Sequence, residues 1–368
     1  MHRPRVLVVD DSVVVRRLVS KALEAEEEVE VVGVAADGSI ALANIERLHP
    51  DIVILDVAMP VMDGLAALAE IRERWPVLPV IMFSTLTSRG AEVTLDALAL
   101  GASDYVLKPS GGDAASSMEK IRAELLPRIA ALLPQARESR ERPTNRLPAR
   151  PSRASGQVEK PSGPLQRIDL IAIGISTGGP TALAELVPSL PGDLPVPVAI
   201  VQHMPPMFTK ILAERLTHKS ALTVVEAGDG ERLRPGSVYI APGDLHLAIA
   251  ARDRDHLHVY DGPHENSCRP SVDPLFRSVA ERYGPHALGI VMTGMGSDGL
   301  RGAEHLVAAG ARVLVQDEAS SVVWGMPGFV ARAGLADAVV PLEGLRGEIL
   351  RRVAVGRDPA LVEAGATS

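Results

Sequence analysis

Short apolar runs alternate with longer segments of helical periodicity in the first third of the chain. The apolar runs cover residues 6–9, 52–55, 80–83 and 105–107. Apolar residues at helical spacing occupy 12–24 and 64–72. Buried strands that alternate with amphipathic helices are typical of βα units on a parallel sheet. The pattern predicts an α/β domain with a doubly wound sheet.

The same alternation returns from about residue 166, which predicts a second doubly wound α/β domain. Its strands are expected at 170–173, 198–201, 289–292 and 313–315. Between residues 222 and 260 the apolar runs are short, and turn signals such as Gly228-Asp229-Gly230 separate them. This middle segment predicts an antiparallel hairpin insertion.

Proline, arginine, serine and glycine dominate the segment between the two patterns. Such a composition has too few apolar residues to bury a core, and it is typical of a flexible tether. The predicted organisation is a first domain over 1–125, a linker over 126–165, a second domain over 166–355 and a tail over 356–368.

Composition excludes several classes of protein. The 368 residues are 46% hydrophobic and 23% charged, as in folded globular proteins. A net charge of -8 and 3% aromatic residues argue against nucleic acid as a partner. No apolar run is long enough for membrane insertion, no signal segment precedes the first strand, and Cys268 is the single cysteine. We expect a cytoplasmic protein.

Polar residues follow the predicted strands of the first domain. Asp10 and Asp11 follow the first run, Asp56 ends a later one, and Ser84 and Lys108 follow the last two. Carboxyl ends of parallel strands share one edge of a sheet, so these side chains should meet. Clustered carboxylates favour a divalent cation, and Asp56 beside Lys108 could attack a phosphoryl group. The alternative is that Asp10 or Asp11 caps the next helix.

The second domain has three residues of complementary chemistry at predicted strand ends. Ser176 lies in a glycine-flanked turn before a helix, His203 follows the next strand, and Asp298 lies in a later glycine-rich loop. A hydroxyl nucleophile, a base and a carboxylate that orients the base would form a hydrolytic triad. Ser176 as a helix cap and the glycines as a phosphate-binding turn are alternatives. The order Ser, His, Asp excludes the α/β-hydrolase arrangement.

Three other residues are weighed on weaker grounds. His246 is expected to pack structurally rather than to line the site. For Arg269, orienting a substrate carboxylate and closing a loop are equally good interpretations. Cys268 has no evident base partner, and we expect it to take no part in the chemistry.

The motifs VLVVDDS, ILDVAMPVMDG, MFST and GASDYVLKP resemble the receiver domain of response regulators over residues 5–125. The resemblance implies Asp56 as phosphoacceptor, with a chemotaxis histidine kinase as phosphodonor. It implies Mg2+ held by Asp11, Asp56 and the Ala58 carbonyl, with Asp10 supporting it through water. It also implies a switch formed by Ser84, Tyr105 and Lys108, and a cis Lys108–Pro109 bond.

The motifs GISTGGP, QHMPP, APGDLHL, RPSVDPLF, TGMGSDG and GMP resemble the catalytic domain of the CheB family over residues 166–350. The resemblance implies a protein-glutamate methylesterase and protein-glutamine glutaminase that acts on methyl-accepting chemotaxis receptors. Ser176 would be the nucleophile, His203 the base and Asp298 its orienting partner. Backbone N–H groups around Thr177 and Met295 would form the oxyanion hole, and no cofactor is implied in this domain.

Two other functions are weighed against this one. A response regulator with a non-catalytic binding output would need Asp56 but no triad. A nucleotide-binding oxidoreductase would use GISTGG as a phosphate turn, but the full G-x-G-x-x-G pattern is missing.

Overall fold

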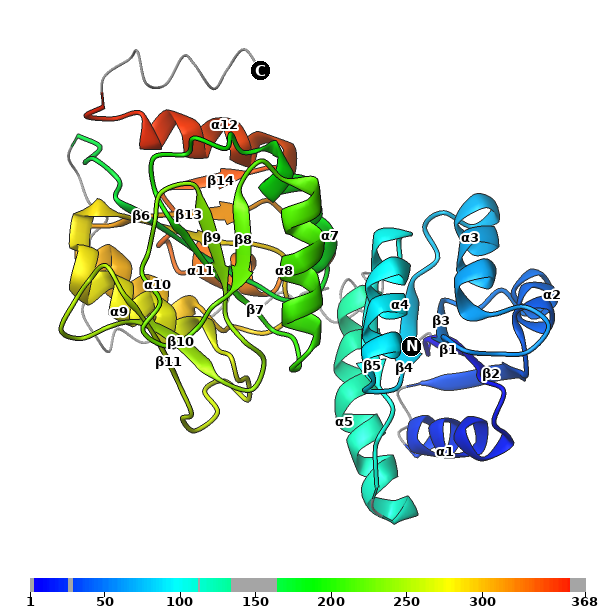
Figure 1. Cartoon of the computed structure of the whole chain (residues 1–368). Coiled ribbons are helices and arrows are strands. Elements are labelled where there is room, and N and C mark those ends of the chain that lie inside the picture. The colour runs from blue at the N-terminus through cyan, green and yellow to red at the C-terminus, as the bar shows by residue number, and fades with distance from the viewer. Residues whose placement is uncertain (1–2, 26–28, 112, 134–163, 358–368) are drawn as a thin grey trace, which may run out of the picture. The chain divides into compact units, whose positions relative to one another are not determined.

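The computed structural model describes residues 3–25, 29–111, 113–133 and 164–357. It divides into two compact units, Met1–Ala154 and Ser155–Ser368, and each is described by itself (Figure 1). Most of the predicted linker, 134–163, and nearly all of the predicted tail, 358–368, lie outside the described residues.

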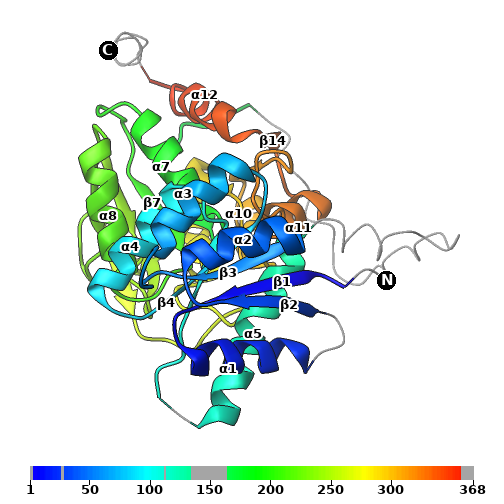
Figure 2. The ribbon, with the colours of Figure 1, turned by 90° about the vertical axis from the view of Figure 1, so that its right-hand side faces the viewer.

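The first unit is built on a five-stranded parallel sheet with the order β2-β1-β3-β4-β5. Its strands are β1 (Arg5–Val9), β2 (Glu30–Ala35), β3 (Ile52–Asp56), β4 (Val80–Ser84) and β5 (Asp104–Leu107). Its helices are α1 (Val13–Glu24), α2 (Gly38–Leu48), α3 (Gly64–Arg74), α4 (Ser88–Ala99) and α5 (Ala114–Leu132). Helices α1 and α5 cover one face of the sheet, and α2, α3 and α4 cover the other (Figure 2).

Each helix described in the first unit begins after a residue whose side chain accepts a hydrogen bond from the first turn. These caps are Ser12, Asp37, Asp63, Thr87 and Asp113. Such residues satisfy backbone N–H groups that have no partner within the helix. Because Ser12 caps α1, the alternative in which Asp10 or Asp11 does so is wrong.

Helix α5 extends past the predicted domain boundary at 125. It runs to Leu132 although Pro127 lies inside it, and proline normally weakens a helix interior. Ile129 and Leu132 are buried, so packing against the domain carries the helix through this point. The first seven residues of the predicted linker therefore belong to the first domain.

The second unit is built on a seven-stranded parallel sheet with the order β14-β13-β12-β6-β7-β9-β8. The strands are β6 (Leu170–Ile175), β7 (Val198–Gln202), β8 (Thr223–Glu226), β9 (Ser237–Ile240), β12 (Ala287–Val291), β13 (Arg312–Gln316) and β14 (Ala338–Val340). The helices are α7 (Gly179–Ser189), α8 (Phe208–Lys219), α9 (Val272–Tyr283), the 3-10 turn η1 (Gly284–His286), α10 (Leu300–Ala308), α11 (Met326–Arg332) and α12 (Leu342–Val353). Helix α7 packs against α8 and α12, and α10 packs against α9 and α11. Figure 1 shows the sheet between these two groups.

The predicted hairpin insertion is correct only in its second half. Strands β10 (His246–Ile249) and β11 (Leu257–Tyr260) form a separate antiparallel pair. Strands β8 and β9, by contrast, extend the parallel sheet beyond β7. Three of the four residues of β9 are buried, as expected for a strand covered on both faces.

Apolar side chains fill the sheet interiors of both units. The central strands β3, β4, β6, β7 and β12 are buried along their whole length. Within the described part of the chain, no helix combines the length and hydropathy needed to cross a membrane. In β3, β4 and β7 the one polar residue is the last, which places Asp56, Ser84 and Gln202 at the carboxyl ends of their strands.

Candidate functional site

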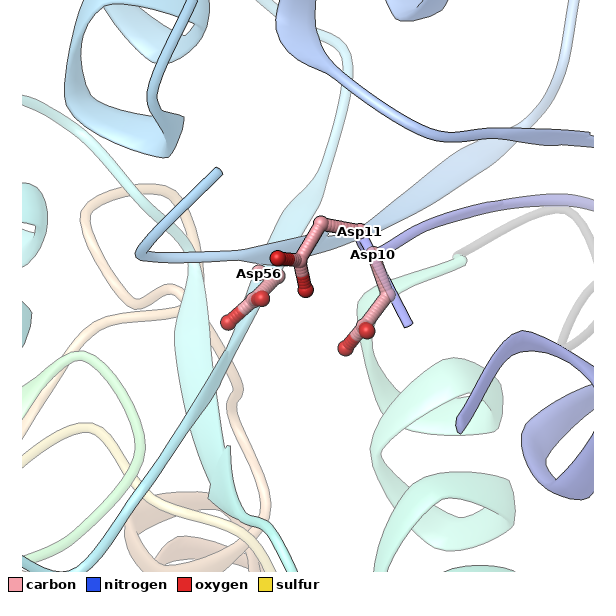
Figure 3. Close-up of side chains that lie close together, drawn as sticks. All are labelled: Asp10, Asp11 and Asp56. Atoms are coloured by element: carbon pink, nitrogen blue, oxygen red, sulfur yellow. The ribbon is translucent and has the colours of Figure 1, made fainter. Parts of the chain in front are cut away.

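Three carboxylates and one lysine meet where β1, β3 and β5 end. Lys108 Nζ lies 2.7 Å from Asp10 Oδ2 and 2.8 Å from Asp56 Oδ1. One oxygen from each of Asp10, Asp11 and Asp56 lies within 4.8 Å of the other two. Figure 3 shows the three aspartates gathered at this edge of the sheet. The structure thus brings together the side chains that the strand ends predicted.

Asp10 and Asp56 are buried, and the negative charges of the cluster are only partly balanced by Lys108. Desolvation raises the pKa of Asp56, which Lys108 lowers in part and Asp10 raises again. Burial also disfavours the Lys108 ammonium, but hydrogen bonds to both carboxylates raise its pKa. One lysine against three carboxylates leaves room for further positive charge. Because Mg2+ prefers oxygen ligands, the donor set fits this ion, and the assignment of Asp11 and Asp56 as its direct ligands stays a prediction.

Ser84 and Tyr105, the predicted switch residues, lie on the neighbouring strands β4 and β5. Ser84 is buried, and its hydroxyl donates to the carbonyls of Thr85 and Gly90, each at 3.4 Å. Tyr105 is largely enclosed, and burial raises the pKa of its phenol. In this structure the Ser84 hydroxyl faces the start of α4, so its contact with a phosphoryl group on Asp56 stays a prediction.

The prediction of a cis bond between Lys108 and Pro109 is wrong. Among the described residues, the cis peptide joins Arg269 and Pro270. A bond before proline favours trans by only about 0.5–1 kcal/mol, so the sequence alone does not determine the isomer. Ala58 is exposed just beyond β3, and the use of its carbonyl as a metal ligand stays a prediction.

Ser176 occupies the turn between β6 and α7. Its N–H donates to the Thr293 carbonyl at 3.0 Å, and its carbonyl accepts the Gly179 N–H at 2.7 Å. Gly178 is the cap residue of α7, so the alternative in which Ser176 caps this helix is wrong. A Cβ built on Gly294 would lie 2.8 Å from Ser176 Cβ. The loop after β12 therefore needs a glycine to approach Ser176 this closely.

His203 comes directly after β7 and lies beside the strand that carries Ser176. Ile175 pairs with Gln202 between β6 and β7, and the His203 N–H donates to the Ile175 carbonyl at 3.2 Å. On the imidazole ring, Nε2 lies 2.7 Å from Asp298 Oδ2. With Nε2 held by Asp298, Nδ1 is the ring nitrogen left for a proton from a nucleophile.

Asp298 is buried, and donors surround its carboxylate. Besides His203, these are the Asn266 amide, the Ser271 hydroxyl and the N–H groups of Val272, Asp273 and Gly299. Burial raises the pKa of Asp298, but the hydrogen bond and charge of His203, with the other donors, lower it to about 2. An ionised Asp298 can orient the His203 ring and stabilise an imidazolium.

Cys268 lies at the opposite nitrogen of the same ring. Its Sγ is 3.7 Å from His203 Nδ1, so the prediction that Cys268 lacks a base partner is wrong. Burial disfavours the imidazolium, but the contacts with Asp298 and Cys268 raise the pKa of His203 to about 10. The two residues are 65 positions apart, and no motif spacing indicated their contact.

Asn266 is a site residue that sequence reasoning missed. Its Nδ2 donates to Asp298 Oδ1 at 2.7 Å and to Asp273 Oδ2 at 2.8 Å. Its backbone is left-handed, with φ of 52°, a conformation that asparagine adopts more readily than most residues. The only signal in the sequence was its place just before the RPSVDPLF motif.

The two weaker candidates both have structural roles. Arg269 pairs with Asp244 at 2.8 Å and with Asp261, and its guanidinium also donates to the Gly262 carbonyl. These contacts close the loop before α9, and the orientation of a substrate carboxylate by Arg269 stays untested. His246 is buried, with Nε2 at 2.9 Å from the Pro263 carbonyl, as expected for structural packing.

Similarity to known proteins covers both units. The family described as CheB methylesterase matches residues 171–349, and the response regulator receiver domain matches residues 6–119. A protein-glutamate methylesterase/protein-glutamine glutaminase from Nocardioides sp. is 52% identical over 369 residues, which is 99% of each chain. The chain belongs to the CheB family.

Other CheB-family proteins are also similar to this chain. A protein-glutamate methylesterase/protein-glutamine glutaminase from Trichodesmium erythraeum is 47% identical over 356 residues, covering 96% of this chain and all of the relative. The crystal structure of the Thermotoga maritima CheB methylesterase catalytic domain is 40% identical, covers 54% of this chain and 100% of that one, and has a TM-score of 0.48. The predicted fold class, a receiver followed by a CheB-type α/β domain, is confirmed.

Proposed function

We propose that this CheB-family chain hydrolyses glutamate methyl esters on methyl-accepting chemotaxis receptors in the cytoplasm and releases methanol. The same chemistry would convert specific receptor glutamines to glutamate. The observation that carries the proposal is the His203–Asp298 pair at 2.7 Å, in which His203 directly follows β7, the strand paired with the one that leads to Ser176.

In the proposed reaction, Ser176 Oγ attacks the γ-carbonyl carbon of the ester, and His203 accepts the hydroxyl proton at Nδ1. Asp298 stabilises the resulting imidazolium from Nε2. Backbone N–H groups at Thr177 and Met295 stabilise the oxyanion. His203 returns the proton to the departing methoxide, and water then hydrolyses the acyl-enzyme to free glutamate and Ser176.

The receiver would control this activity through Asp56. A chemotaxis histidine kinase would transfer its phosphoryl group to the Asp56 carboxylate, which lies 2.8 Å from the Lys108 ammonium. Mg2+ would neutralise charge on the phosphoryl oxygens when bound. Asp11, Asp56 and the Ala58 carbonyl would hold the ion and Asp10 would support it. Phosphorylation of Asp56 would change the negative charge that Lys108 faces, and Ser84 and Tyr105 would transmit this change to the rest of the receiver.

The deciding experiment measures methanol release from a methylated receptor, with and without Mg2+ and a small-molecule phosphodonor. We expect Ser176→Ala to lower the rate by about 10⁵- to 10⁶-fold, because the nucleophile is lost. The variant should keep the wild-type thermal transition. Equal turnover by the folded variant would rule out a serine nucleophile, and a wild-type chain that binds receptor without turnover would indicate a non-catalytic output.

A further inference from the structure

Gln202, the last residue of β7, lies beneath the turn that carries Ser176. Its side chain is 2% exposed. Nε2 donates to the Ser176 carbonyl at 3.1 Å and to the His203 carbonyl at 3.3 Å. An amide nitrogen has two hydrogens, so this one group links the backbones of both residues.

The other end of the Gln202 amide has no partner. Oε1 is buried and accepts no hydrogen bond among the described residues. A Cβ built on Gly179 would lie 1.9 Å from this oxygen, so a side chain at position 179 would displace the Gln202 amide. Burying an unpaired carbonyl is unfavourable, and an apolar side chain of the same shape would avoid that cost. Stability alone therefore does not explain a glutamine at this position.

Gln316 shows what a buried glutamine in a structural role looks like in the same sheet. It is the last residue of β13 and fully buried. Its Oε1 accepts the Thr293 N–H at 2.9 Å, and Nε2 donates to the Ser320 carbonyl and hydroxyl at 2.8 and 3.2 Å. Both ends of that amide are paired, whereas Gln202 uses only the end that faces Ser176 and His203.

We propose that Gln202 is a positioning residue for the hydrolytic reaction. By holding the two carbonyls with one amide group, it fixes the separation between the Ser176 hydroxyl and the His203 ring. It does not touch the substrate, and the inference rests on the proposed function of these two residues. Proton transfer requires close approach of nucleophile and base, so a small displacement should reduce the rate sharply.

The test uses Gln202→Met in the full-length protein, which keeps the side-chain length but removes the donor. A fluorophosphonate probe reports on Ser176 without any receptor: the Oγ–phosphorus bond forms, fluoride leaves and His203 takes the proton. We expect the rate of probe labelling, and kcat for receptor demethylation, to fall by about 10- to 100-fold while KM changes little. Labelling and kcat at the wild-type level would overturn the inference.

Tyr239→Phe is the matched control for the loss of buried hydrogen bonds. Tyr239 is 2% exposed on the neighbouring strand β9, and its hydroxyl accepts the Arg234 N–H at 3.0 Å and donates to the Arg232 carbonyl at 2.8 Å. The substitution removes two buried bonds that reach neither Ser176 nor His203. It should lower the thermal midpoint but leave labelling and kcat unchanged. Equal losses of labelling in both variants would make Gln202 a stabilising residue only.

Gly179→Ala displaces the Gln202 amide by an independent route, because the new Cβ occupies the position of Oε1. It should slow labelling of Ser176, and in a Gln202→Ala background it should cost little more. Additive losses in the double variant would contradict positioning through Gln202. This test still applies if Gln202→Met folds poorly. Failure of the wild type to label at Ser176 would reject the proposed function itself, which separates the two failures.

Discussion

The two sites of this CheB-family chain each lie at the carboxyl edge of their own parallel sheet, but their carboxylates have opposite surroundings. In the receiver, Asp10 and Asp56 share one Lys108 ammonium, and Asp11 is exposed. In the methylesterase domain, Asp298 accepts bonds from six surrounding groups. One carboxylate cluster is short of positive charge, and the other carboxylate is fully satisfied by the protein.

This difference indicates what each site requires. A buried carboxylate with few donors has a raised pKa, as at Asp56, and gains from an added cation. A carboxylate that accepts many hydrogen bonds has a lowered pKa, as at Asp298, and needs no ion. The receiver is therefore suited to respond to ligands, whereas the methylesterase site is preorganised for one reaction.

Among the changes that test this comparison of the two carboxylate sites, the largest effect is expected from Asp298→Asn. The amide keeps the shape but loses the charge and can no longer impose the His203 tautomer, so turnover should fall by about 10³- to 10⁴-fold. The measurement is the initial rate of methanol release. Asp229→Asn is the control, because Asp229 pairs with His258 at 2.9 Å on the surface and should not affect the rate. A rate within tenfold of wild type would reject the preorganised triad.

The second prediction concerns the receiver. Asp56→Asn, or removal of Mg2+ by a chelator, should abolish stimulation of methanol release by a phosphodonor and leave the basal rate. The amide that replaces the Asp56 carboxylate beside Lys108 has no anionic oxygen with which to attack phosphorus. Asp37→Asn serves as the control, since Asn caps α2 as well as Asp does. If the phosphodonor still stimulated methanol release by the Asp56 variant, the response would depend on a residue other than Asp56.

Most of the residues that the structure brings together could be predicted, because each lies at the end of a strand with a strong local pattern or in the loop that follows one. Strands such as β3 and β7 are apolar up to their last residue, and the polar residues at or directly after their ends stand out. Asp56, His203 and their partners were found in this way. The local pattern also predicted the order of the βα units, because each strand and helix forms from residues that are close together along the chain.

The missed features depend on contacts between distant segments. Strand β2 was not predicted; it pairs only with β1, and one of its residues is buried. Nothing in the local sequence tells that β9 inserts between β7 and β8 in the parallel sheet. Likewise, Cys268 and Asn266 approach His203 and Asp298 through a turn before α9, and motif spacing carries no record of that approach.

A third, smaller effect is expected on the pH profile. The base must be neutral, so activity should rise with pH through the His203 pKa, which lies above its ordinary 6.5 at about 10. Cys268→Ala removes one contact that raises this pKa, so the rising limb should move to lower pH and the rate at neutral pH should increase. Ser267→Ala is the control at the adjacent position. An unmoved limb would show that Cys268 does not influence the base.

The smallest effect is expected from Ser12→Ala, which tests whether the two units respond separately. Ser12 caps α1 beside the acidic cluster, and its hydroxyl accepts the Val15 N–H at 3.4 Å. Because this capping hydrogen bond is long, its loss should lower the free energy of unfolding of the receiver by only about 0.5–1 kcal/mol. Calorimetry should show a lower receiver transition, an unchanged methylesterase transition and an unchanged basal rate. A shift in both transitions would mean that the stability of the receiver and that of the methylesterase domain are coupled.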